Sequence, residues 1–122
     1  MNRNEFITQY TAFANQALAL AQKARREGLL ALEDSIDQKK ADERDIFEYG
    51  LRFVIDGYDP AIIEKILGNI INQEKDEYAR ILKTMQMEAA LGVQQGIAPG
   101  VLHYILNSFT DISLSDDLHP ED

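Results

Sequence analysis

Cysteine is absent from this sequence, so neither a disulfide framework nor a thiolate zinc site can form. Histidine is scarce: His103 and His119 stand 16 residues apart, not at the spacing that places two imidazoles on one helical face around a metal. The sequence also lacks a glycine-rich phosphate loop, a GxSxG nucleophile elbow and a secretory signal. These absences exclude the commonest metal and nucleophile sites, and they favour a cytoplasmic location.

Acidic side chains are plentiful, so a catalytic carboxylate pair has to be considered. Asp56 and Asp59 flank a turn signal, where they are better explained as helix-end residues than as an acid–base couple. Glu74, Asp76 and Glu77 fall on the polar side of a predicted helix, which is usually a solvated face. A few helices of this pattern leave little room for a walled pocket. We therefore expect no catalytic residue, no cofactor and no metal.

Positive charge is scarce in the second part of the sequence. Residues 1–40 carry six Lys and Arg against five Asp and Glu, whereas residues 41–122 carry six against sixteen. The whole chain has a net charge of −9. Because an acidic surface repels phosphate backbones and anionic lipids, we expect no nucleic acid partner and no direct membrane insertion. Basic protein surfaces are the plausible partners, and simple solubility is the alternative explanation of the charge.

Apolar residues recur at three- and four-residue steps, which predicts an all-α fold. The first predicted helix is long, from about residue 4 to residue 36, with Gly28 marking a kink or a close helix contact. Asp42 is expected to cap a second helix, which ends at Gly57 with a positive φ. The dipeptide Asp59-Pro60 then starts a third helix that runs as far as residue 87.

The long first helix is predicted to pack against the hairpin of the second and third helices, with a short C-terminal helix after it. Residues 89–106 are near the length of a membrane span, but their Gln, His, Pro and Gly residues argue against one. We expect residues 1–110 to form a single helical domain. Residues 111–122 have five acids and no Lys or Arg, and we expect them to be a disordered acidic tail.

One stretch is charge-dense at both ends and apolar between them: Lys23-Ala-Arg-Arg-Glu-Gly-Leu-Leu-Ala-Leu-Glu33-Asp34. Within one helix, Arg25 and Glu33 would lie about 12 Å apart on neighbouring faces. Together with Arg26 and Glu27, they would be placed to meet complementary charges on a partner protein. The alternative is that these residues form pairs only inside the domain, with one another or with the second helix.

Two blocks carry a resemblance to a known family. The run Ala24-Arg-Arg-Glu-Gly-Leu-Leu-Ala-Leu-Glu33, followed by Gly50-Leu-Arg-Phe-Val-Ile-Asp-Gly-Tyr-Asp-Pro60, resembles the cytoplasmic region of the flagellar motor stator protein MotA. The likeness spans roughly residues 20–77. In that family the region lies between the second and third membrane spans and faces the rotor switch protein FliG. One Arg and one Glu there engage charged residues of FliG, and by position they correspond to Arg25 and Glu33.

The family has four membrane helices and this sequence shows none, so the resemblance implies a relative without ion conduction. We expect a non-catalytic binding protein of motility and chemotaxis, cytoplasmic and peripheral at the inner membrane through the motor. Its expected partner is the flagellar rotor switch protein, the stator complex or another basal-body component. The alternative is a general helical adaptor or regulatory protein that uses the same scaffold for an unrelated partner. We also expect a homo-oligomer, formed through the stripe of Phe6, Tyr10 and Phe13.

Overall fold

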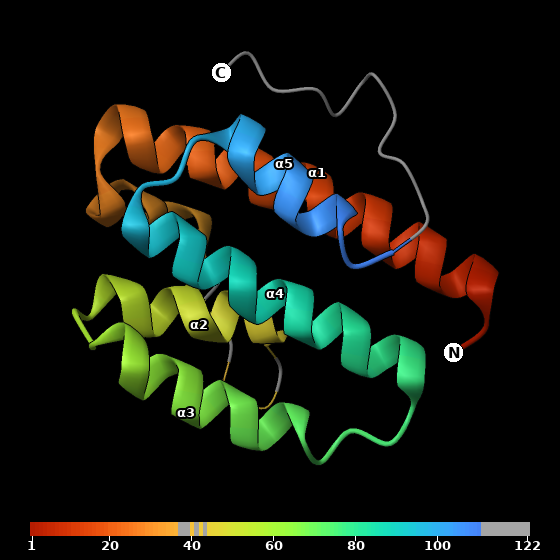
Figure 1. The fold of residues 1–122 in the computed structure, drawn as a ribbon. Coiled ribbons are helices and arrows are strands. Elements are labelled where there is room, and N and C mark those ends of the chain that lie inside the picture. Colours follow the sequence, from red (N-terminus) through yellow and green to blue (C-terminus); the bar gives the residue numbers. More distant parts are fainter. Residues whose placement is uncertain (37–39, 41, 43, 111–122) are drawn as a thin grey trace.

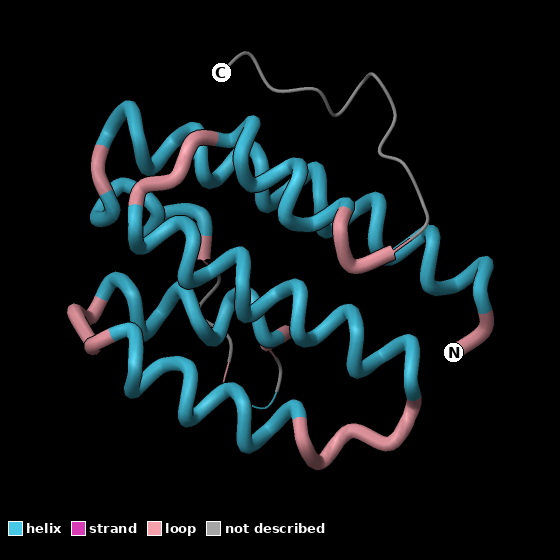
Figure 2. The backbone as a smooth tube through the Cα atoms, in the orientation of Figure 1, coloured by secondary structure: helices cyan, strands magenta, loops and turns pink. Residues whose placement is uncertain are grey.

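A computed structural model of the chain describes residues 1–36, 40, 42 and 44–110, and it contains helices and loops but no strand in that part (Figure 2). The all-α prediction is therefore confirmed. His119 and the predicted acidic tail lie outside the described residues. The helical elements in chain order are α1 (Arg3–Glu27), the 3₁₀ helix η1 (Leu29–Ser35), α2 (Ile46–Ile55), α3 (Pro60–Ile71), α4 (Glu77–Gln95) and α5 (Pro99–Asn107).

Helix α4 lies at the centre of the arrangement (Figure 1). It packs against α1 and α5 on one side and against α2 and α3 on the other. The larger apolar cluster is built mainly from α1, α4 and α5, and the smaller one from α2, α3 and α4. The first helix meets the α2–α3 hairpin through the edge-on contact of Phe13 with Phe47, whose ring centroids are 5.3 Å apart. Most of the remaining buried face of α1 packs on α4 and α5.

The first helix is shorter than its periodicity predicted, because α1 ends at Glu27 rather than near residue 36. The cause is Gly28, whose φ of 91° is a conformation that residues with a side chain rarely adopt. Its N–H still donates to the carbonyl of Ala24 at 2.9 Å, and the chain then turns into η1. Leu32 of η1 is fully buried, so the apolar run after Gly28 folds back onto the core instead of prolonging α1.

Helix α2 begins three residues later than predicted. Its N-cap is Asp45, whose Oδ1 accepts a 2.7 Å hydrogen bond from the Glu48 N–H, so the assignment of the cap to Asp42 was wrong. The other end of α2 agrees with the prediction, since Gly57 has a φ of 84° and Pro60 occupies the first turn of α3. Asp59 stands at the N-cap of α3, although its side chain makes no capping hydrogen bond.

The predicted third helix is two helices. It breaks after Ile71 because residues 72–77 contain no apolar side chain that a continuous helix could bury. Asp76 caps α4 instead, its Oδ2 accepting from the Ala79 N–H at 2.8 Å. Glu74 lies in the connecting turn, where its Oε1 accepts from Lys83 Nζ at 2.8 Å. These two acids therefore shape a turn, rather than lying along the solvated face of a helix as predicted.

Helix α4 continues to Gln95 through a segment whose small residues had suggested the end of a helix. Those residues serve close packing: a Cβ added to Gly50 of α2 would lie only 2.9 Å from the Cβ of Ala90. Residues 89–106 are divided between the end of α4 and most of α5. In the part of the chain that the structure describes, no helix combines the length and the apolar content that crossing a membrane requires.

The aromatic stripe of α1 lies inside the protein. Phe6, Tyr10 and Phe13 are 2%, 0% and 5% exposed, so they cannot form the predicted interface between two copies. Phe6 stacks on Tyr78 of α4 with a centroid distance of 4.9 Å. The sequence pattern could not distinguish a stripe buried in the core from a stripe buried between two copies, because an apolar stripe packs equally well in either place.

Candidate partner-binding surface

The four charged residues singled out in the sequence lie at one end of the helix bundle. At this end the C-termini of α1, α2 and α4 meet η1 and the first turns of α3 and α5 (Figure 1). Arg25, Arg26 and Glu27 form the last turn of α1, and Glu33 lies in η1. All four side chains are exposed. We call these four residues, with Arg52 and Asp56 of α2, the charged end.

Arg25 and Glu33 do not share a helix, as the prediction of one continuous helix required, because Gly28 separates α1 from η1. Each side chain instead contacts another element. The Nη1 of Arg25 donates a 2.9 Å hydrogen bond to the carbonyl oxygen of Gly96, the C-cap of α4. The last carbonyls of a helix have no partner within the helix and carry the negative end of its dipole, so a guanidinium there is favourable.

Glu33 pairs with Arg52 of α2, which lies outside the charge-dense stretch of residues 23–34. The Nη2 of Arg52 lies 3.3 Å from Glu33 Oε1 and 3.3 Å from Asp56 Oδ1. The spacing of Arg52 and Asp56, four residues apart on one helix, was the available signal. The pairing inside the domain, which the sequence left as the alternative, is thus present for Glu33. The exposed fraction of Glu33 is still 54%, which leaves its carboxylate accessible from solvent.

A further contact joins this end together. Gln94 Nε2 of α4 donates to the carbonyl oxygen of Tyr58, in the turn between α2 and α3, at 2.8 Å. Arg25, Arg52 and Gln94 therefore each link two different elements. Large apolar side chains also reach solvent on η1, on the α2–α3 turn and on the first turn of α3: Leu30 is 73% exposed, Tyr58 44% and Ile62 46%. Exposed apolar groups beside charged ones are a common composition of protein-binding surfaces.

The described residues contain few other groups that could form a catalytic or metal-binding site. Within residues 1–36, 40, 42 and 44–110, no three His, Asp or Glu side chains come together as a metal site would require. His103 is buried on α5, and its ring packs edge-on against Tyr104 with a centroid distance of 5.4 Å. Burial raises the pKa of the Glu88 carboxyl, and the nearby Glu64 carboxylate adds to that shift.

The curated proteins that this chain matches include Motility protein A from three bacteria. The chain is 37% identical over 59 residues to Motility protein A of Borreliella burgdorferi, a match that covers 48% of this chain and 22% of the relative. It is 33% identical over 87 residues to Motility protein A of Treponema pallidum and 36% identical over 87 residues to that of Treponema phagedenis. Each of these two matches covers 71% of this chain and 32% of the relative.

The chain thus spans between about a fifth and a third of the length of these curated relatives. No protein-family model and no solved structure matches it. The expected resemblance is confirmed: over much of its length, this chain is similar to part of Motility protein A.

Proposed function

We propose that this chain is a non-catalytic protein-binding module of the bacterial flagellar motor, related to the stator. The observation that carries the proposal is the exposure of Arg25, Arg26, Glu27 and Glu33 at one end of a chain that resembles Motility protein A. Charged groups on a surface speed and orient the association of two proteins when the opposite charges face them. The charged end carries both signs, which suits a partner whose own surface carries both.

The partner that fits this proposal is the flagellar rotor switch protein or the stator complex itself. Binding there would hold the chain at the cytoplasmic face of the inner membrane through the motor, without membrane insertion. Nucleic acid is not a partner in this proposal, because the chain carries a net charge of −9. The proposal also treats residues 1–110 as one domain. Self-association stays a prediction, and it would need a surface other than the buried aromatic stripe of α1.

The test is a double charge reversal, Arg25→Glu with Glu33→Lys, which leaves the net charge of the chain unchanged. The purified full-length variant is compared with the wild type in binding to the purified rotor switch protein and to the stator complex. We expect weaker binding to one of these, with a larger difference at low salt, where screening is least. Thermal unfolding should change little, because exposed ion pairs contribute only about 0–1 kcal/mol.

A matched control is available at the opposite end of α4. Lys75→Glu with Glu77→Lys makes the same exchange at two exposed positions in and beside the α3–α4 turn. This control should bind as the wild type does. If both variants bind like the wild type and swimming is unaltered, the motor proposal is wrong. The adaptor or regulatory protein with an unrelated partner would then be the better explanation.

A further inference from the structure

Two long stretches of the chain contain no Asp, Glu, Lys or Arg, although 27% of all residues are charged. They are residues 6–22 and residues 89–110, and the structure describes every residue of both. All the charged side chains of the sequence therefore lie in residues 1–5, 23–88 and 111–122. The exposed face of a helix usually carries charged as well as polar residues, so the two stretches present an unusual surface to solvent.

The fold brings these two stretches together. Residues 6–22 form most of α1, and residues 89–110 include the end of α4 and the whole of α5. Helix α5 packs on α1, and both lie on the opposite side of α4 from α2 and α3 (Figure 1). The hydroxyl of Tyr10 in α1 also contacts Oδ1 of Asn107 in α5 at 3.4 Å. One side of the bundle is thus built from charge-free helix.

The side chains that α1 and α5 expose here are hydroxyls, amides and apolar groups. Val101 and Tyr104 are one turn apart on α5, and they are 50% and 68% exposed. His103, the one histidine of the two stretches, is buried. We call the exposed residues of the two stretches the uncharged face, and its members include Thr8, Ala12, Asn15, Ala19, Val101 and Tyr104.

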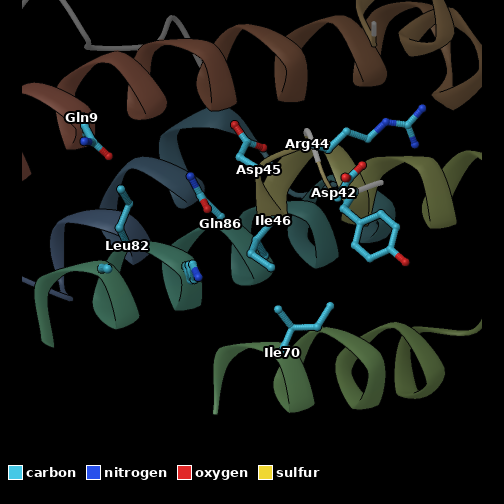
Figure 3. Close-up of a pocket in the computed structure, with 11 residues that line it drawn as sticks. Gln9, Asp42, Arg44, Asp45, Ile46, Ile70, Leu82 and Gln86 are labelled. Carbon is cyan, nitrogen blue, oxygen red and sulfur yellow. The ribbon is translucent and has the colours of Figure 1, made fainter. Parts of the chain in front are cut away.

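The uncharged face ends where α1 meets the other helices on its far side. Gln9 of α1 lines a hollow of about 510 Å³ there (Figure 3). Asp45, the N-cap of α2, and Lys83 of α4 line the same hollow, so charged side chains begin at this edge. Toward the C-terminus of α1, Lys23 is the first charged residue and the charged end follows it.

A second copy of this chain is the partner that the uncharged face fits. In a two-fold dimer the same patch lies on both copies, so it has to be complementary to itself. Apolar groups meet that condition, and so do the amide of Asn15 and the hydroxyl of Tyr104, because each of them both donates and accepts. Since the chain has a net charge of −9, two copies repel each other least where charge-free helices meet.

The size of the uncharged face indicates a weak dimer. Seventeen residues of helix extend about 25 Å, and two packed helices are about 20 Å wide. The face therefore covers at most about 500 Å² on each copy, or about 1,000 Å² in total, which is the low end of specific interfaces, where association is transient.

We propose that the chain forms a weak, reversible homodimer through the uncharged face of α1 and α5, with Val101 and Tyr104 in the interface. This surface is distinct from the charged end, and the proposal does not rest on the motor function. Salt separates the two. Screening reduces the attraction between opposite charges at the charged end, but it also reduces the repulsion between two acidic copies. The dimer should therefore become stronger as salt is added, whereas partner binding at the charged end should become weaker.

Sedimentation equilibrium of the purified full chain tests the proposal at about 10 μM to 1 mM, the range in which weak complexes dissociate. We expect the mean mass to rise with concentration from 13.8 kDa toward twice that value. Ala12→Glu and Tyr104→Glu each place two like charges in a two-fold interface. Each should weaken the dimer by about tenfold or more.

Ala61→Glu is the matched control. Ala61 is exposed on α3, on the other side of α4, and the change makes the net charge one unit more negative, as Ala12→Glu and Tyr104→Glu do. This control should dimerise as the wild type does, and so should the double charge reversal of Arg25 and Glu33. Thermal midpoints of all three Glu variants should stay close to that of the wild type, because the three positions are exposed.

Three results would overturn the proposal. One is a mass of 13.8 kDa at every concentration and salt. Another is equal weakening by Ala61→Glu and Ala12→Glu, because the effect would then arise from the net charge and not from this surface. The third is a dimer that both Ala12→Glu and Tyr104→Glu leave intact, which would place the contact on another surface.

Discussion

The guanidinium of Arg25 and the carbonyl oxygen of Gly96 lie 2.9 Å apart, although 71 residues separate them in the sequence. The contact joins the last turn of α1 to the C-cap of α4. The residue proposed to contact a partner is thus also a contact within the domain. Because the Arg25 side chain is exposed, water can replace the hydrogen bond when the arginine is removed.

Arg25→Ala should therefore lower the free energy of unfolding by no more than about 1 kcal/mol, the range for an exposed hydrogen bond. Urea unfolding of the wild type and the variant measures this directly. A loss above about 2 kcal/mol would make Arg25 primarily structural. Reduced partner binding in the charge-reversed variant would then need a different explanation.

Gly57→Val should destabilise the turn between α2 and α3 by about 1–2 kcal/mol, because Gly57 has a φ of 84° that a β-branched residue tolerates poorly. Gly68→Ala is the control: Gly68 lies within α3 and an added Cβ meets no atom within 4 Å. That change should be neutral or slightly stabilising. The denaturant midpoint of Gly57→Val should lie below that of Gly68→Ala, and equal midpoints would contradict the strain argument.

Stability should fall in alkaline solution because burial raises the pKa of the Tyr10 hydroxyl to about 12. The unfolded tyrosine ionises near pH 10, so the unfolded state loses its proton first. The contribution of Tyr10 is therefore complete below about pH 10 and is lost as the pH rises through about 12. Tyr10→Phe should make the loss of stability between pH 10 and 12 smaller, although it also removes the 3.4 Å contact with Asn107. Unfolding midpoints between pH 8 and 12 test it, and identical profiles would refute it.

Leu67→Ala should lower the stability of the whole described fold and not only of α3. Leu67 is fully buried in the smaller apolar cluster, and such truncations cost about 2–5 kcal/mol. Since α4 belongs to both clusters, the two should unfold in one transition. The unfolding midpoint followed by circular dichroism should equal the midpoint followed by the solvent exposure of Tyr10, which lies in the larger cluster. Two separate transitions would mean that the clusters are independent, against the proposed single domain.

Part of the candidate site could be predicted from the sequence. The exposure of Arg25, Arg26, Glu27 and Glu33 follows from a charge-dense stretch, and the structure agrees with it. Pairing with the second helix was the alternative that the sequence left open, but the sequence did not identify Arg52 as the partner of Glu33, because the orientation of that helix depends on the core.

The sequence by itself determined the helical content, the turn at Gly57 and the absence of cysteine chemistry. The apolar period and the turn residues act within a few neighbouring positions, and the lack of cysteine is a property of the composition alone. Only the tertiary structure decided where α1 ends and how far α4 extends. Leu32 folds back onto the core after Gly28, and the small residues of α4 let α2 approach closely. It also decided that Phe6, Tyr10 and Phe13 lie inside the core. These outcomes depend on contacts between residues far apart in the chain, and local patterns carry no information about them.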